Sequence, residues 1–427
     1  MSQLRRQAPR TATVPSWAPW PLWALALLAA VLNIRSLVAN AKPLGVDWRA
    51  PGGTLLDFRD LVVVPGRYLW QGGNPYDPVP YLAAHPWAQE FDPYSPAWLL
   101  ISAAIGWMPL HTAALVYLCC MTVISVLFAR MLARWISPYW AAVLTPAIAI
   151  WFQVWFPARG MGSSFLVVLG MTLTLTCLRS RQPRPWLAAT GLALAVLKPQ
   201  FGIPFALALL ALGHYRLIAR GALLAVVSAL PPLVACVVAA GGVTGFAGSI
   251  MRVMRHATSP AAPTGLLAAD SYRVDMPGLV VRVLGRDPGP VPAIVAVVVF
   301  ALVLVLLRRL RPGISASTLV IAPAIFFLPV HLTYDIILMA LVAAAALDLL
   351  LARRTPLKLA TAVVACIPVL HLHRISAMAG LSGLGGDLLD AGCTLVALLL
   401  GCALAITASR SDPALSAVRR AAHDDTV

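Results

Sequence analysis

The sequence predicts an all-α polytopic membrane protein with about 12 (roughly 11–13) transmembrane helices, and three observations predict it. The 427 residues are 60% hydrophobic and 11% charged, with a mean hydropathy of +0.83. A water-soluble chain could not hide that much apolar surface. Apolar runs of about 20 residues recur as far as the C-terminus, which is the length that a membrane-crossing helix needs. Short basic clusters separate these runs, as in proteins that follow the positive-inside rule.

The net charge of +16 raises the question of nucleic-acid binding. The basic residues lie in short clusters between apolar runs, where they orient helices, so we expect no nucleic-acid partner. The seven cysteines lie within apolar runs and none has CxxC spacing, so neither a zinc site nor a disulfide framework is indicated.

The basic clusters also predict the topology of a single transmembrane domain over residues 1–427. Arginines at the start of the chain place residues 1–16 in the cytoplasm. The run 17–39 is long for a signal peptide and no clear small-residue cleavage site follows it, so we expect a retained first span. Outer loops are expected at 40–96 and 242–288, and a cytoplasmic tail at 409–427. The predicted spans are 17–39, 110–130, 138–157, 161–178, 186–198, 202–213, 221–241, 290–307, 314–331, 333–352, 358–372 and 384–408.

One short apolar segment, Ala97 to Leu110, does not fit this alternation. It begins outside, and the next basic cluster requires that it also end outside. Either it dips into the membrane and returns, or one basic loop breaks the rule.

The first outer loop differs in composition from the rest of the chain. It holds the only glutamate of the sequence, Glu90, and it mixes acids with aromatic side chains. Carboxylates supply a general base, and aromatic rings give a sugar or a lipid tail a flat surface. We therefore expect the 40–96 loop to be the catalytic loop, with juxtamembrane helices and a water-accessible pocket at the membrane face. Its acids are Asp47, Asp57, Asp60, Asp77, Glu90 and Asp92.

Asp57 and Asp60 are the candidate catalytic residues, because a carboxylate near a sugar hydroxyl and shielded from water can take its proton. Three residues apart, they share a face if this stretch is helical. Alternatively, one of them caps a helix or pairs with Arg59 or Arg67.

A turn signature follows at Gly72–Pro78, where glycine supplies unusual dihedral angles and an Asn-Pro step forces an extended residue before the proline. Asn74 and Tyr76 of this turn are candidate substrate contacts.

Lys198 interrupts an apolar stretch and is followed by Pro199. A lysine there costs a few kcal/mol unless it has a partner or reaches the interface. It either contacts the phosphate of a lipid donor or snorkels at the end of a span. Arg159 is another cation on the predicted outer face that could serve the donor.

His331, Tyr334 and Asp335 lie at a predicted outer-face turn between two spans. His331 and Asp335 are four residues apart and could face one pocket. A polar pocket wall is the favoured interpretation. Metal binding is disfavoured because no third ligand is evident. The sequence therefore indicates no cofactor, and dependence on a divalent metal is left open.

Several catalytic motifs are absent from the sequence: Walker A, GxGxxG after a strand, HExxH and GxSxG. A soluble nucleotide-binding domain is therefore not expected. Any activated donor should be lipid-linked and reached from the outer side.

The chain resembles the GT-C glycosyltransferases that use polyprenyl-phosphate sugars, of the actinobacterial mannosyltransferase and arabinofuranosyltransferase type. The motifs that carry the resemblance occur in the same order over about residues 17–408. They are Asp57-Phe58, Gly72-Gly73-Asn74-Pro75-Tyr76-Asp77, Tyr94-Ser95-Pro96, a degenerate Gly160-Met161-Gly162, Leu197-Lys198-Pro199 with Gln200, and the polar cluster from His331 to Asp335.

The resemblance implies that Asp57 is the base, that Tyr94 and Gln200 belong to the substrate-binding set, and that a single displacement inverts the sugar. In the family, a tyrosine-containing run is common after this aspartate. This chain departs from the pattern, because Asp60 and Leu-Val-Val-Val stand there, and Asp60 therefore remains the second candidate for the base.

We therefore expect a multi-pass cell-membrane enzyme that moves a mannosyl or arabinofuranosyl unit from a polyprenyl-phosphate donor. The acceptor is a cell-envelope glycolipid or polysaccharide on the outer face, and membrane lipids surround the enzyme. The alternative is a transporter or flippase for a lipid-linked sugar, for which a broken helix at Lys198–Pro199 would also serve. A transporter, however, calls for polar residues at mid-membrane in matched halves, and no internal repeat is visible.

Overall fold

The computed structural model describes residues 19–53, 55–156, 163–180, 182, 184–257, 265–267, 273–380 and 383–410. Within these residues the regular elements are helices, and the one β-bridge, between Arg273 and Leu332, is isolated. The prediction of an all-α membrane protein is thus confirmed. The first half contains α1 (Trp20–Ala39), α2 (Leu56–Phe58), the π-helix η1 (Arg59–Val63), α3 (Val64–Trp70), α4 (Pro78–Ala84), α5 (Trp98–Gly106), α6 (Leu110–Ile136), α7 (Ala141–Trp155), α8 (Ser163–Arg179), α9 (Pro185–Ala195) and α10 (Pro199–Ala211). The second half contains α11 (Tyr215–Ala239), α12 (Val243–Ala257), α13 (Met276–Leu284), α14 (Val291–Leu310), α15 (Ile314–Phe326), η2 (Thr333–Ile337), α16 (Leu338–Ala352), α17 (Pro356–Cys366), η3 (Pro368–Leu370), α18 (Leu372–Met378) and α19 (Gly383–Arg410).

Each predicted span coincides with a helix, but the helices differ in length. Six are long and apolar enough to cross a membrane: α1, α6, α11, α14, η2 with α16, and α19. A seventh span results if the bent pair Pro356–Leu370 and Leu372–Met378 crosses as one. The remaining five predicted spans are α7, α8, α9, α10 and α15, which are apolar helices of 10–17 residues. Length and composition therefore support fewer full crossings than the predicted twelve.

Prolines lie inside, or at the start of, several of these short helices. Pro146, Pro204 and Pro323 lie inside α7, α10 and α15, where each removes a backbone hydrogen-bond donor. Pro199 starts α10 directly after Lys198, so α9 and α10 remain two short helices. Backbone groups left free at such breaks are tolerated at membrane depth only within protein or beside a water-filled cavity.

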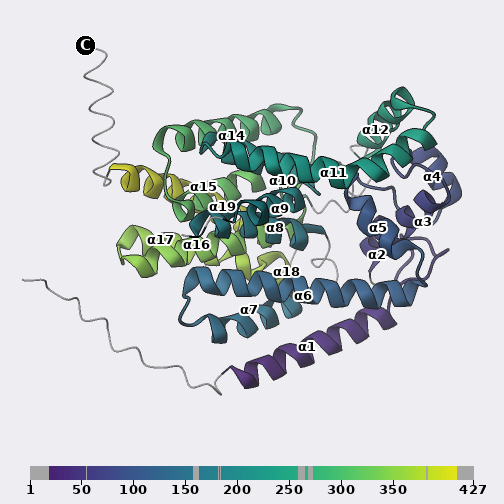
Figure 1. Ribbon diagram of the computed structural model, residues 1–427. Coiled ribbons are helices and arrows are strands. Elements are labelled where there is room, and N and C mark those ends of the chain that lie inside the picture. The colour runs from purple at the N-terminus through teal and green to yellow at the C-terminus, as the bar shows by residue number, and fades with distance from the viewer. Residues whose placement is uncertain are drawn as a thin grey trace, which may run out of the picture.

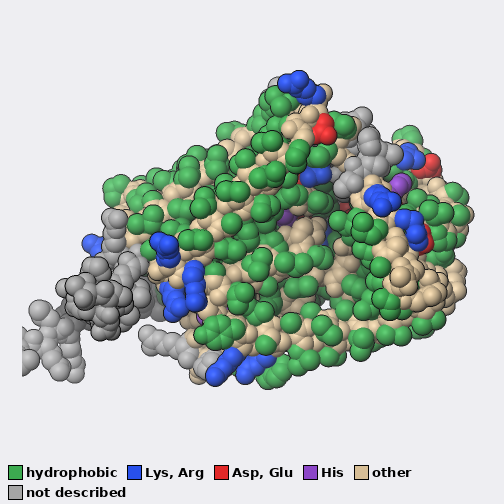
Figure 2. All heavy atoms as spheres, turned by 90° about the horizontal axis from the view of Figure 1, so that it is seen from above, with side chains coloured by type: hydrophobic (Ala, Val, Ile, Leu, Met, Phe, Trp, Pro, Cys, Tyr) green, Lys and Arg blue, Asp and Glu red, His purple; other side chains and the backbone are tan. Residues whose placement is uncertain are grey.

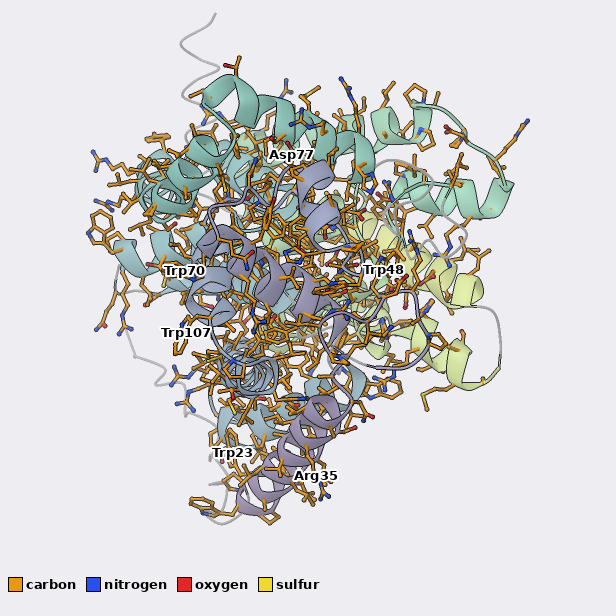
Figure 3. The ribbon with its side chains drawn as sticks, turned by 90° about the vertical axis from the view of Figure 1, so that its right-hand side faces the viewer. Trp23, Arg35, Trp48, Trp70, Asp77 and Trp107 are labelled. Atoms are coloured by element: carbon orange, nitrogen blue, oxygen red, sulfur yellow. The ribbon has the colours of Figure 1, made fainter. Side chains whose placement is uncertain are left out.

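The long helices lie side by side in a bundle, and α2 to α5 together with α12 gather at one end of it (Figure 1). We call this group of short helices, together with the segments that connect α1 to α5, the cap. Seen from that end, Trp48, Trp70 and Asp77 lie in the cap, and Arg35 lies on α1 at its edge (Figure 3). The cap contains the predicted catalytic loop, so that loop covers one end of the bundle.

The short segment 97–110 belongs to this cap. Its helix α5 has nine residues and is therefore about 14 Å long, which is too short to cross a bilayer. α5 packs tightly on α3: a Cβ atom added at Gly66 would lie 2.0 Å from the carbonyl oxygen of Ser102, and one at Gly106 would lie 2.8 Å from the carbonyl carbon of Gly66. The absence of a side chain at both glycines lets the two backbones touch.

The opposite end of the bundle holds a separate polar contact. Arg179 at the end of α8 donates to Asp348 near the end of α16 (Nη2 to Oδ1, 2.8 Å), and Ser315 at the start of α15 donates to the same carboxylate (2.6 Å). The beginnings of α8 and α16 therefore lie together at the capped end. Between the ends, hydrophobic side chains cover most of the surface seen in Figure 2, while Lys and Arg gather in a few clusters.

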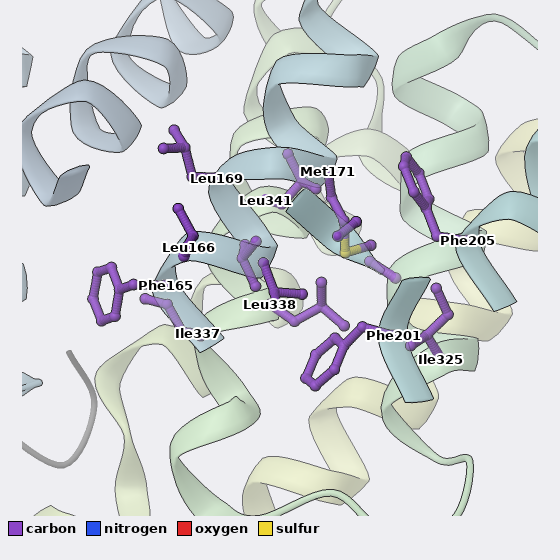
Figure 4. Packing of buried hydrophobic residues seen from close by; sticks show 14 of the residues in the cluster. Phe165, Leu166, Leu169, Met171, Phe201, Phe205, Ile325, Ile337, Leu338 and Leu341 are labelled. Atoms are coloured by element: carbon purple, nitrogen blue, oxygen red, sulfur yellow. The ribbon is translucent and has the colours of Figure 1, made fainter. Parts of the chain in front are cut away.

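The core beneath the cap is built from α8, α10, α15 and α16. Figure 4 shows Phe165, Phe201, Ile325 and Leu338 from these four helices in one buried cluster. Each of these side chains is fully buried, and dispersion contacts at native packing density hold the helix ends in register. The starts of α8, α10 and η2 are thereby fixed next to one another.

Candidate active site

The segment around Asp57 begins with an unusual backbone. Leu55 has φ +61°, a left-handed conformation that is uncommon for a leucine, and α2 passes directly into the π-helix η1. The Phe58 ring packs against Tyr117 of α6, with ring centroids 4.6 Å apart. Leu55 and Phe58 are buried while Asp57 is only partly buried. The buried side chains of Leu55 and Phe58 thus fix the segment that carries Asp57 where the cap meets α6 of the bundle.

Asp60 has a different environment, because it forms a buried two-pronged ion pair with the preceding Arg59. The distances are 2.6 Å from Arg59 Nε to Oδ1 and 2.9 Å from Nη2 to Oδ2. Arg59 also donates to the carbonyl oxygens of Pro43 (3.1 Å), Val46 (2.8 Å) and Trp87 (3.3 Å). Both charged side chains are at most 1% exposed. The pair therefore ties the segments 43–46 and 87–89 of the cap to η1.

Lys198 meets two residues that are distant in sequence. Its Nζ donates to Ser164 Oγ at 2.8 Å and lies 3.5 Å from Asp335 Oδ1, and Ser164 Oγ donates to the same carboxylate oxygen at 2.6 Å. Lys198 is 2% exposed and Asp335 1%. A buried ion pair persists only when further hydrogen bonds satisfy its charges. Here the Leu332 N–H also donates to Asp335 Oδ2 at 3.0 Å.

Aromatic rings surround the Lys198 ammonium group. The Nζ atom lies 5.1 Å from the ring centroid of Tyr334 and 5.7 Å from those of Tyr94 and Phe201. Cations are attracted to ring faces at such distances, more strongly when water is excluded. Ser163 Oγ donates to the Tyr94 hydroxyl at 3.1 Å, which fixes that ring. The cation therefore lies in an aromatic enclosure whose rings come from three separate segments of the chain.

His331 and Gln200 complete this group. His331 is fully buried, its ring centroid lies 4.5 Å from that of Phe201, and its Nδ1 lies 3.5 Å from Asp335 Oδ2. Gln200 lies in the first turn of α10, two residues after Lys198, and is partly buried. The predicted polar wall from His331 to Asp335 thus faces the start of α10.

Asp92 connects the Asp57 segment to this enclosure. Burial, together with the nearby charges of Glu90 and Asp57, raises the pKa of Asp92 to about 7, against the lowering effect of Lys198. Burial and the charges of Asp92 and Asp57 likewise raise the pKa of Tyr94 well above its ordinary value. Coulomb interactions of this kind require proximity in a poorly screened environment. Asp57, Asp92, Tyr94 and Lys198 therefore belong to one electrostatic neighbourhood.

The predicted turn at Gly72–Pro78 packs against the enclosure through a hydrogen bond to Tyr94. Asn74 Oδ1 accepts the backbone N–H of Tyr76 (3.1 Å), which closes the turn, and the Tyr76 hydroxyl donates to the carbonyl oxygen of Tyr94 (2.8 Å). Both side chains are buried. Asp77 then caps α4 and pairs with Arg252 of α12 (2.5 Å), which joins the turn to the second half of the chain.

The structure thus brings Asp57, Tyr94, Lys198, Gln200, His331, Tyr334 and Asp335 to one end of the bundle, while Asn74, Tyr76 and Asp60 lie in the surrounding layer. The predicted contact Arg159 lies outside the described residues. Sequence reasoning did not single out Ser164 or Asp92 as site residues. Each has only a weak sequence signal: Ser164 follows the glycine-rich Gly160–Gly162 motif, and Asp92 stands between Phe91 and Pro93.

Among the described residues, no group of three or more His, Cys, Asp or Glu side chains could hold a metal ion. Asp335, the carboxylate in contact with Lys198, instead accepts hydrogen bonds from the Ser164 hydroxyl and the Leu332 N–H.

Comparison with known proteins places part of the chain in a described family. Residues 93–330 match the family model described as glycosyltransferase family 87. This range contains Tyr94, Ser164 and Lys198, and it ends immediately before His331. No curated protein matches the chain, and no solved structure does.

Proposed function

The chain belongs to glycosyltransferase family 87, and we propose that its reaction is the transfer of a mannosyl or arabinofuranosyl unit from a polyprenyl-phosphate donor to a cell-envelope glycolipid or polysaccharide. The observation that carries the proposal is the buried group of Lys198, Ser164 and Asp335 at the end of the bundle covered by the Asp57 segment. A membrane protein whose buried ammonium group is paired with one carboxylate and surrounded by aromatic rings is suited to a phosphate attached to a lipid and a sugar.

In the proposed reaction Asp57 is the general base. Its carboxylate takes the proton from an acceptor hydroxyl while that oxygen attacks the anomeric carbon of the donor. The bond between this carbon and the phosphate oxygen breaks, its electron pair stays on the polyprenyl phosphate, and the configuration inverts. The partial burial of Asp57 supports a base that is shielded but reachable.

Lys198 is proposed to bind the donor phosphate. Negative charge on the phosphate grows as the bond breaks, so a fixed cation stabilises the transition state more than the ground state. Asp335 and Ser164 are proposed as positioning residues, because their hydrogen bonds hold the ammonium group within the aromatic enclosure.

Asp60 is proposed to be structural. Both of its oxygens accept hydrogen bonds from Arg59, whose guanidinium group is itself held by the Pro43 and Val46 carbonyl groups, so the pair has a structural role in the cap. Asp57 is the better supported of the two candidate bases.

The outer face is proposed for the reaction. The Arg179–Asp348 contact, the arginines at the end of α14 and those that follow α16 lie at the other end of the bundle from Lys198. The positive-inside rule puts that other end in the cytoplasm. A donor sugar on the outer leaflet would then meet Lys198 and Asp57 directly.

The test replaces Asp57 by Asn and measures sugar transfer from a lipid-linked donor in membranes. Loss of a general base lowers the rate by roughly 10²–10⁴-fold. The matched control is Asp47→Asn, in the same loop, because Asp47 is exposed. Full activity of D57N, or an equal loss in D47N, would discard Asp57 as the base.

The donor is identified by incubating membranes separately with radiolabelled polyprenyl-phosphate mannose and polyprenyl-phosphate arabinofuranose. We expect one of the two to label a lipid or polysaccharide product in a manner that depends on Asp57. Transfer from neither would refute the polyprenyl-phosphate assignment.

A further inference from the structure

A groove opens between α10 and α14, away from the candidate active site. Its volume is about 500 Å³, within the range of small-molecule sites of about 300–1,000 Å³. The walls are apolar and include Leu207 and Leu210 of α10 and Leu304 and Val305 of α14. Leu210 and Val305 are about half exposed, so this groove faces the surroundings of the helix bundle, which in a membrane are lipid.

One end of the groove is polar and basic. Tyr215, Arg308 and Arg309 line it there, and both arginines are exposed. No acidic side chain lines the groove among the described residues. Both arginines belong to the last turn of α14, where a basic residue also complements the helix dipole, and both line this end of the groove. Apolar walls that end in a pair of arginines match a molecule with a hydrocarbon tail and an anionic head.

The groove lies far from the Lys198 enclosure along the same helix. α10 begins directly after Lys198, and the groove is formed near its other end, at Leu207–Ala211. Thirteen residues of helix correspond to about 20 Å. A phosphate held by Arg308 and Arg309 is therefore a different phosphate from one held by Lys198.

We propose that this groove is a binding site for one anionic diacyl phospholipid, with an acyl chain between α10 and α14 and the phosphate on Arg308 and Arg309. Guanidinium groups bind phosphate oxygens in pairs and favour lipids whose net charge is negative. The Tyr215 hydroxyl, two-thirds exposed at the same end, is placed to bond the glycerol or ester oxygens at the interface.

The test is native mass spectrometry of the purified full chain titrated with phosphatidylglycerol and, separately, phosphatidylcholine. Each arginine near the phosphate contributes about a fivefold change in affinity, so R308Q/R309Q should bind phosphatidylglycerol more than tenfold more weakly. The matched control is R353Q/R354Q, because this exposed arginine pair follows α16 and does not line the groove. Its binding should equal that of the unsubstituted protein.

A second variant tests the apolar part of the site. Leu210→Trp fills the groove without changing its charge, and Leu210 is exposed enough for the larger side chain to be accommodated. We expect it to weaken phosphatidylglycerol binding as well, with an unchanged melting temperature in detergent.

Three results would overturn the proposal. The first is equal binding of phosphatidylcholine and phosphatidylglycerol by the unsubstituted protein. The second is equal loss in the two arginine pairs, which would indicate general surface charge. The third is displacement of phosphatidylglycerol by polyprenyl phosphate at stoichiometric concentration, which would assign the groove to the tail of an isoprenoid lipid.

Discussion

Replacing Lys198 by Met removes the buried ammonium group while keeping a flexible side chain of similar length. Removing one partner of a buried ion pair typically costs about 3–5 kcal/mol of stability. Asp335 keeps its hydrogen bonds from Ser164 and Leu332, so we expect a cost at the lower end of that range. Loss of a group that stabilises transition-state charge lowers the rate by about 10²–10³-fold. Thermal unfolding in detergent and transfer from a polyprenyl-phosphate sugar in membranes measure the two effects.

The double variant K198M/D335N separates these effects. With Asp335 neutral as well, no uncompensated charge remains, and the melting temperature should recover toward that of the D335N single variant. Transfer should stay as low as in K198M, because no cation meets the phosphate. If K198M/D335N regained the transfer rate of D335N, Lys198 would serve only to neutralise Asp335, and its assignment to the donor would be refuted.

Three further predictions concern the layer around this site and the bundle. Because the pKa of Asp92 is raised to about 7, its stabilising contribution is present below about pH 4 and is lost as the pH rises through 7. The melting temperature of D92N relative to the unsubstituted protein should therefore rise between pH 5 and pH 8, and a difference independent of pH would contradict this. Tyr76→Phe removes the bond to the Tyr94 carbonyl and should cost about 1 kcal/mol in denaturant unfolding, with reduced transfer; full activity would show that the turn does not position Tyr94. Gly191→Ala places a Cβ atom 2.6 Å from a backbone oxygen of α8 and should cost about 1–3 kcal/mol, whereas Gly392→Ala, with open space around it, should cost nothing; equal melting temperatures would refute the close α8–α9 contact.

The helical class and the positions of the helices could be predicted because helices that face lipid appear in the sequence as long apolar runs. A helix that faces lipid needs apolar side chains along its length, as in α14, where the apolar run 290–307 nearly matches Val291–Leu310. The number of full crossings was harder to predict. Apolar composition does not reveal whether a helix such as α9, with eleven residues, spans the bilayer or is packed within the bundle against α8 and α11.

The site could be predicted only where its residues are close in sequence. His331 and Asp335 are four apart in sequence, and their side chains do lie 3.5 Å apart, although His331 precedes the short helix η2 that carries Asp335. The bond from Ser164 to Asp335 joins residues 171 positions apart, and that from Lys198 to Ser164 joins residues 34 apart. Such pairings arise from the packing of α8, α10 and η2, and no local pattern encodes them.

The contrast between Asp57 and Asp60 shows the same limit. The sequence offered both as the base and also offered pairing with Arg59 as the alternative. Adjacent residues on a regular helix do not face each other. The π-helix η1 and the carbonyl groups of Pro43 and Val46, which hold the guanidinium group, make this adjacent pair favourable. Only the fold of the cap shows that Asp60 forms the ion pair with Arg59.

The arrangement around Lys198 also explains how a buried cation can serve an anionic substrate that comes and goes. The positive end of the α10 dipole and the ammonium group of Lys198 coincide at the start of α10, and Asp335 supplies the opposing charge. A donor phosphate would compete with Asp335 for the ammonium group, which would be costly if the carboxylate were then left without partners. Ser164 and the Leu332 N–H both donate to Asp335, so in the proposed reaction the carboxylate would stay hydrogen-bonded when Lys198 binds the phosphate. Under that proposal, the hydroxyl and the backbone donor would lower the cost of opening the buried ion pair.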